Sequence, residues 1–109
     1  MTFAFDDLYA MFDMTPVQNQ FILEYLPGAK GDYVKIYLYG LLCCYHPRKE
    51  MDISSMSREL GLTEDVIHAA FRYWERRGIV RRISDNPPAW QYINITQVSM
   101  GGDPGPDKD

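Results

Sequence analysis

Residues 57–82 have the pattern of two helices that are separated by a tight turn and followed by the start of a strand. Gly61 lies where the first helix should end. Thr63 is placed to cap the next helix, with Val66 as its first inward residue, and Gly78 lies where a helix C-terminus favours a left-handed residue. The pattern is that of a helix-turn-helix that runs into a β-strand.

The second of these helices has two distinct faces. Apolar residues recur at the spacing of one helical face: Val66, Ile67, Ala70, Phe71 and Trp74. Polar residues fall on the opposite face: Glu64, Asp65, His68, Arg72 and Glu75. We therefore expect the first face to pack on the core and the second to face outward.

The elements on either side complete a recognisable order. Downstream, residues 79–83 and 90–95 read as two strands joined by a turn at residues 85–88. Upstream, residues 51–53 read as a short strand, and Ser54 or Ser55 as the cap of a helix that carries Met56 and Leu60. The predicted fold is mostly α with a small β-hairpin wing, namely a winged helix-turn-helix.

Residues 33–45 form a segment with a single charge, Lys35, and apolar residues on nearly every side, which is typical of a buried helix. Asp32 is its expected cap, and Gly40 in its middle indicates close approach by another helix. We assign its tyrosines and thiols to the core, the thiols as buried and unbridged. These residues are Tyr33, Tyr37, Tyr39, Tyr45, Cys43 and Cys44.

The N-terminal segment, residues 3–13, is predicted to be a short amphipathic helix. Its apolar side chains must cover either the core of the domain or a neighbouring subunit, and both readings stay open. In the second reading the self-association residues are Phe3, Phe5, Leu8, Tyr9 and Phe12. A second short helix is expected from a cap at Asn19 to Pro27-Gly28.

A chain of 109 residues indicates one domain with a single modest core. We place the domain at residues 1–97, with an N-terminal extension at 1–27 and the winged-helix core at 32–95. Residues 98–109 are rich in Gly, Pro and Asp, which predicts a disordered linker into a C-terminal domain that this chain lacks.

The charge distribution bears on nucleic-acid binding. The formal net charge is −4, and only residues 61–83 carry a positive surplus, of +2. A pI near 5.0 argues against tight non-specific binding to DNA. The sequence has neither a secretory signal pattern nor a run of about 20 apolar residues, so we expect a cytoplasmic protein without membrane contact.

The sequence contains residue types that enzymes use, but they do not form a known catalytic or metal-binding motif. The two histidines, His46 and His68, lack metal-ligand spacing, and there is no Gly-rich phosphate loop and no nucleophile motif. We therefore predict that the protein is not an enzyme and that it uses no cofactor, metal ion or small-molecule substrate.

DNA reading by the second helix would use the outward residues of its N-terminal half, which are Glu64, Asp65 and His68. Two carboxylates there would repel phosphates. A basic cluster follows, with Trp90 and Tyr92 on the return strand, and it would hold a phosphate backbone or stack bases. The alternative is that its arginines are solvated or paired with Glu75 and Asp85 and that the two aromatic residues belong to the core. With His68, the candidate nucleic-acid contacts are Arg72, Arg76, Arg77, Arg81 and Arg82.

Three stretches, residues 21–46, 56–82 and 85–95, resemble the N-terminal domain of DnaD-like replication proteins of Gram-positive bacteria, over residues 1–97 in all. The strongest signals are two sets of residues: Glu24-Tyr25 with Pro27 ahead of Lys35, Tyr37, Leu38 and Tyr39, and Tyr73-Trp74-Glu75 with Gly78-Ile79-Val80.

The resemblance implies a winged-helix domain that self-associates and contacts other initiation proteins during primosome assembly and helicase loading. In that family DNA binding lies mainly in a separate C-terminal domain. We therefore expect a non-catalytic interaction and self-association module that forms a homo-oligomer, with weak DNA binding at most. The alternative is a transcription regulator that binds DNA through the helix-turn-helix and the wing arginines.

Overall fold

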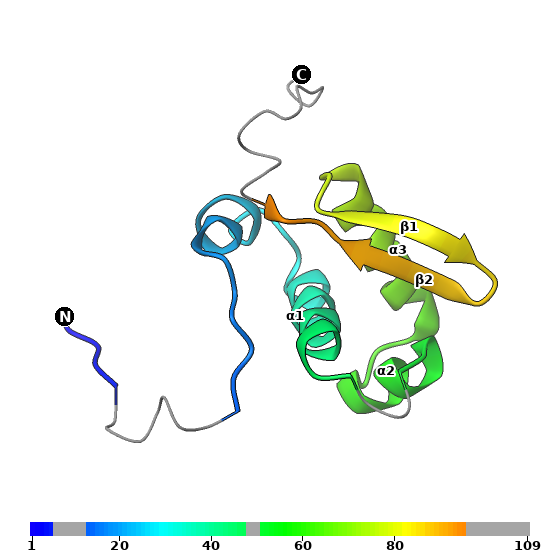
Figure 1. The fold of residues 1–109 in the computed structure, drawn as a ribbon, viewed down its shortest axis with the longest axis horizontal. Coiled ribbons are helices and arrows are strands. Elements are labelled where there is room, and N and C mark those ends of the chain that lie inside the picture. Colours follow the sequence, from blue (N-terminus) through cyan, green and yellow to red (C-terminus); the bar gives the residue numbers. More distant parts are fainter. Residues whose placement is uncertain (6–12, 48–50, 96–109) are drawn as a thin grey trace.

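The computed structural model describes residues 1–5, 13–47 and 51–95 of the chain. Within them the fold is mostly helical with one two-stranded antiparallel hairpin (Figure 1). The elements, in chain order, are η2 (Phe21–Tyr25, a π-helix), α1 (Gly31–Tyr45), α2 (Ile53–Leu60), α3 (Glu64–Arg76), β1 (Val80–Asp85) and β2 (Pro88–Tyr92).

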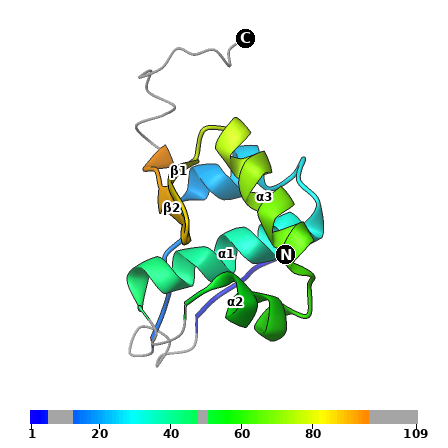
Figure 2. The same ribbon diagram turned by 90° about the vertical axis from the view of Figure 1, so that its right-hand side faces the viewer.

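The core lies where α1 crosses α3 and η2 packs over both (Figures 1 and 2). Trp74 of α3 is fully buried, and its Nε1 donates a hydrogen bond of 2.9 Å to the carbonyl oxygen of Tyr33 in α1. Phe21 of η2 stacks on Tyr37 of α1 with 4.2 Å between ring centroids. These contacts place the N-terminal extension on the same core as the helices that follow it.

The ends of α3 are as predicted. The Thr63 side chain accepts a hydrogen bond of 3.2 Å from the Val66 amide. Gly78, just beyond the last turn, has a φ of 84°, which the absence of a side chain permits. The predicted inward residues are buried, except for Val66, which is partly buried: Ile67, Ala70, Phe71 and Trp74.

The start of α2 differs from the prediction, since residues 51–53 do not form a strand. Asp52 is the N-cap and Ile53 begins the helix. The Asp52 carboxylate accepts from the Ser55 amide at 2.8 Å, and the Ser55 hydroxyl lies 3.2 Å from the Asp52 amide, which completes a capping box. Reciprocal capping by Asp52 and Ser55 therefore replaces the strand and the serine cap that we expected.

The hairpin follows α3 as predicted, but its second strand starts earlier. Only Asn86 and Pro87 separate the strands, and Asp85 already pairs with Pro88. The predicted return strand at 90–95 is therefore displaced to Pro88–Tyr92. The register shifts between Arg82 and Ser84, which leaves Ile83 outside the regular pairing.

Helix α1 begins at Gly31 after an extended Lys30, so the predicted cap at Asp32 is wrong. The helix buries one face and not its whole circumference, because Leu38, Cys44 and Tyr45 are exposed. Gly40 is a point of close approach, as expected, but its neighbour is not a helix. A Cβ at Gly40 would overlap the hydroxyl of Tyr92, which comes from β2.

The N-terminal part also differs from the predicted pair of α-helices. Residues 1–5 lie outside any helix, and residues 6–12 lie outside the described part of the chain, as does the predicted linker at 98–109. The second predicted helix is a short π-helix whose N-cap is Gln20, not Asn19. No helix in the described ranges combines the length and the apolar character needed to cross a membrane.

Candidate functional site

The arginines of the predicted basic cluster are divided between different surroundings. Arg77 is partly buried, lies 4.7 Å from the ring centroid of Tyr25, and donates a hydrogen bond of 3.1 Å to the Tyr73 hydroxyl. Since Tyr25 belongs to η2 and Tyr73 to α3, Arg77 joins these two elements. This geometry gives Arg77 a structural role.

Arg82 and Arg81 make contacts within the hairpin. The Arg82 guanidinium lies 2.9 Å from the Asp85 carboxylate, and this hydrogen bond raises the pKa of Arg82. Arg81 donates to the side-chain oxygen of Gln91 on the facing strand. The expected pairing of arginines with Asp85 is therefore present for Arg82.

Trp90 does not offer an open face for stacking. The Phe71 ring stacks on the Trp90 ring, with 4.2 Å between the ring centroids and 11° between the ring planes. The Arg82 guanidinium lies 5.7 Å from the centroid of the Trp90 ring. The His68 ring meets it edge-on at 6.0 Å. The Trp90 Nε1 is buried without a hydrogen-bond partner in the described part of the chain. Base stacking on Trp90 would require these neighbours to move.

The outward face of α3 carries charges of both signs. Arg72 and Arg76 are exposed, and among the described residues they make no ion pair or hydrogen bond. Glu64 and Asp65 are exposed in the first turn, where Glu64 accepts a hydrogen bond of 3.1 Å from the Ser54 hydroxyl. A ligand that approached the N-terminal half of α3 would meet carboxylates first.

Large apolar side chains are exposed on the N-terminal part of the chain. Phe3 and Phe5 have exposed fractions of 86% and 78%, and Leu23 of η2 has 73%. Ile22 beside it is also exposed. The other three predicted self-association residues lie outside the described ranges: Leu8, Tyr9 and Phe12.

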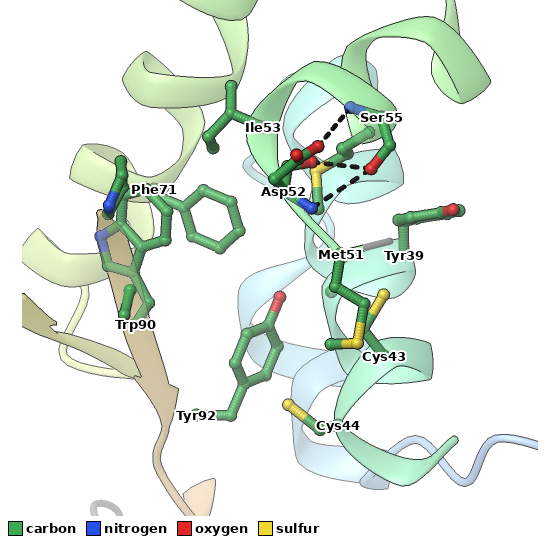
Figure 3. A pocket seen from close by; sticks show the side chains of 14 residues that line it. Tyr39, Cys43, Cys44, Met51, Asp52, Ile53, Ser55, Phe71, Trp90 and Tyr92 are labelled. Carbon is green, nitrogen blue, oxygen red and sulfur yellow. Dashed lines mark hydrogen bonds between the residues drawn. The ribbon is translucent and has the colours of Figure 1, made fainter. Parts of the chain in front are cut away.

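A pocket that sequence reasoning missed lies between α1, the start of α2, α3 and β2 (Figure 3). Its volume is about 240 Å³. Its walls are mainly apolar, aromatic and sulfur-bearing side chains, including Cys43, Cys44, Met51, Met56, Phe71 and Trp90. We call this cavity the α1–β2 pocket. Its walls come from four separate elements, and the one local signal for it was the glycine at position 40.

The wall of this pocket includes one carboxylate, that of Asp52, whose hydrogen bonds with Ser55 lower its pKa and occupy it. The other titratable groups in the wall are held in their neutral form. The Tyr92 hydroxyl donates to the Tyr37 carbonyl oxygen at 2.8 Å. Burial raises the pKa of Tyr92 well above its usual value. Cys44 is exposed as a residue, but partial burial of its thiol raises the pKa of that thiol, with a further contribution from Cys43. The pocket therefore favours an uncharged occupant.

The thiols and histidines do not assemble a metal centre in the part of the chain that the structure describes. Cys43 is buried as predicted, whereas Cys44 is exposed, and no disulfide joins them. His46 lies near the N-terminal extension, with Nε2 at 2.9 Å from the Met14 carbonyl oxygen and Nδ1 at 3.8 Å from the Asp13 carboxylate. It is remote in sequence from His68, which packs against Trp90.

Comparisons with protein-family models, with curated proteins and with solved structures gave no match to this chain.

Proposed function

We propose that this chain is a non-catalytic, cytoplasmic winged-helix module of a DnaD-like replication protein, which self-associates and binds other initiation proteins during primosome assembly and helicase loading. In this proposal α2 and α3 form the helix-turn-helix and the β1–β2 hairpin is the wing. The order of the helices and the hairpin supports this assignment.

The observation that carries the proposal is the exposure of large apolar side chains at the N-terminal part, namely Phe3, Phe5 and Leu23. Large apolar side chains that a small domain leaves exposed favour burial against another protein. The core of the domain is already filled by other side chains, among them Phe21, Ile36 and Trp74. A protein partner, including a second copy of the chain, would remove the exposed rings from water.

The charge on α3 supports the same proposal. Glu64 and Asp65 are exposed in the half of the helix that would enter a major groove. Phosphates would be repelled there, whereas a protein surface with basic residues would be attracted. This favours assembly over direct reading of DNA.

Light scattering of the full chain over a range of concentrations tests the proposal. We expect the average molar mass to rise with concentration and the rise to be weaker in Phe3→Ala/Phe5→Ala. Ile83→Ala removes an exposed apolar side chain on the wing and is the matched control. A mass that stays at the monomer value throughout would reject self-association.

A second candidate is a DNA-binding transcription regulator. It is favoured by Arg72 and Arg76, which are exposed and make no ion pair among the described residues. It predicts duplex binding that weakens steeply with added salt and is lost in Arg72→Ala/Arg76→Ala. A titration without binding at low salt would reject this candidate.

A further inference from the structure

The α1–β2 pocket has the volume of a site for a small molecule. An apolar cavity of about 150 Å³ binds benzene, and pockets for drug-sized ligands begin at about 300 Å³. The volume of the α1–β2 pocket, about 240 Å³, lies between these two values. It therefore suits a molecule somewhat larger than benzene, such as one substituted ring or two fused rings.

The pocket opens to solvent at one side. Met51 and Cys44 are exposed and form part of its rim, whereas Gly40 and Phe71 are buried and belong to its floor (Figure 3). A small molecule therefore has an entrance that does not require the core to open.

Aromatic and sulfur-bearing side chains form opposite walls of the pocket. Figure 3 shows Phe71 and Trp90 on one side and Met51 and Cys43 on the other. Phe71 and Trp90 stack on each other with 4.2 Å between ring centroids, so each ring holds the other in place. Aromatic rings and sulfur atoms both make favourable contacts with a further aromatic ring. An aromatic molecule therefore gains contacts on both walls that a saturated molecule of the same size does not.

The wall offers no free partner for a charged molecule. Among the lining residues that the structure describes there is no basic side chain, so an anion has no counter-charge. The one carboxylate, that of Asp52, accepts a hydrogen bond of 2.8 Å from the Ser55 amide at the N-terminus of α2, where the helix dipole compensates its charge. A cation therefore finds little attraction. Since burial of an unpaired charge is unfavourable, the lining selects an uncharged molecule.

We propose that the α1–β2 pocket is a binding site for a small, uncharged aromatic molecule of one substituted ring or two fused rings. The bound molecule contacts α1, the start of α2, α3 and β2 together, and so joins the hairpin to the helices. Because it binds only the folded chain, it raises the free energy of unfolding. The pocket lies within one chain, so this inference does not depend on the self-association proposed above.

Methionine methyl groups inside and outside the pocket report binding directly. Met51 and Met56 line the pocket, whereas Met14 does not. The full chain, isotope-labelled at its methionine methyl groups, is titrated with indole and followed by NMR. The Met51 and Met56 resonances should shift in the ring current of the bound molecule and saturate, with a dissociation constant of about 1 mM or lower. The Met14 resonance should stay in place.

Further probes test the chemical class of the ligand. Phenol and cyclohexanol share a six-carbon ring and a hydroxyl group, so they compare an aromatic with a saturated ring. Phenol should bind more tightly than cyclohexanol. Benzoate and benzylammonium carry a negative and a positive charge beside the same aromatic ring. Each should bind about tenfold or more weakly than indole, because its charge finds no partner in the pocket.

Substitutions in the wall locate the site. Ala89→Phe fills the pocket from β2, where Ala89 is a wall residue, and should abolish the shift of the Met56 resonance. Met51→Glu replaces an apolar group at the exposed rim with a charge and should weaken indole binding several-fold, measured at Met56. Leu23→Glu is the matched control, since it adds the same charge at an exposed apolar residue of η2 outside the pocket. It should bind indole as the parent does.

Several outcomes would overturn the proposal. Without a saturating shift, or with an equal shift of Met14, indole does not bind in the pocket. If cyclohexanol binds as tightly as phenol, or a charged probe as tightly as indole, the proposed chemical class is wrong. A folded Ala89→Phe that binds indole as the parent does would place the molecule elsewhere. If Ala89→Phe does not fold, equal binding by Met51→Glu and Leu23→Glu would reject the site.

Discussion

Gly40 is a single position at which one added methyl group should be costly. Its absent side chain leaves room for the Tyr92 hydroxyl, which donates to the Tyr37 carbonyl oxygen. In Gly40→Ala, overpacking of this contact costs about 1–3 kcal/mol, against about 1 kcal/mol gained in helix propensity. The free energy of unfolding, measured with urea, should fall.

Two further variants identify the cause of that loss. Gly28→Ala adds a methyl group where nothing lies within 4 Å, so it should not lower the stability. In a Tyr92→Phe background, where the hydroxyl is absent, Gly40→Ala should cost much less than in the parent. Equal losses in both backgrounds would show that the Tyr92 hydroxyl is not what limits position 40.

Tyr37 and Tyr92 should make the protein sensitive to alkaline pH. Burial raises the pKa of Tyr37 from 10.0 to about 12 and also raises that of Tyr92 well above its usual value, so the fold favours the neutral phenols. Their contribution to stability is complete below pH 10 and is lost as the pH rises through the folded-state pKa. We expect the free energy of unfolding to fall between about pH 10 and 12.

Tyr37→Phe checks this expectation, because its backbone carbonyl remains available to Tyr92 while its phenol is removed. The variant should show a shallower alkaline decline in urea unfolding than the parent does. An unchanged slope would mean that Tyr37 does not ionise with unfolding in this range.

The sequence was informative about Gly40 and less so about its neighbours. A glycine in an apolar helix indicates close packing, but the sequence does not say which element approaches. The neighbour proved to be Tyr92, 52 positions away along the chain. For the same reason Cys44 was expected in the core with Cys43, although only Cys43 faces it. Adjacent helical residues point about 100° apart, and tertiary packing decides which is covered.

The start of α3 depends on a local cap that can be tested by itself. The Thr63 hydroxyl accepts from the Val66 amide at 3.2 Å. Thr63→Ala should lower the free energy of unfolding by about 1 kcal/mol, measured by thermal or urea denaturation. Thr63→Ser keeps the accepting oxygen and should remain close to the parent. Equal losses in the two variants would assign the effect to the methyl group and not to the hydrogen bond.

Elements with local signals were predicted well, and elements that depend on partners were not. The N-cap at Thr63 and the left-handed conformation of Gly78 can be predicted from the residues next to them in the sequence. Both are present in the structure. The start of α2 was predicted wrongly because the residue types of Met51, Asp52 and Ile53 also suit a strand. The helix begins there because Asp52 and Ser55 form a capping box. The hairpin after α3 was predicted, but its turn and second strand were misplaced, because a two-residue turn lets Asp85 pair with Pro88.

At the level of the whole molecule, the candidate basic site was the least predictable part. Sequence spacing grouped five arginines, whereas the structure places Arg77 against η2, Arg82 beside Asp85 and Trp90, and Arg72 on the outward face of α3. Spacing along a chain does not reveal which cations find partners in space. The α1–β2 pocket was missed for the same reason, since four elements must come together to form it.

The central claim is that this chain associates with copies of itself. Sedimentation equilibrium of the full chain, from low micromolar to millimolar concentration, measures this most directly. The account predicts a molar mass that rises above 12.7 kDa as concentration increases. A mass that stays at 12.7 kDa over the whole range would contradict it.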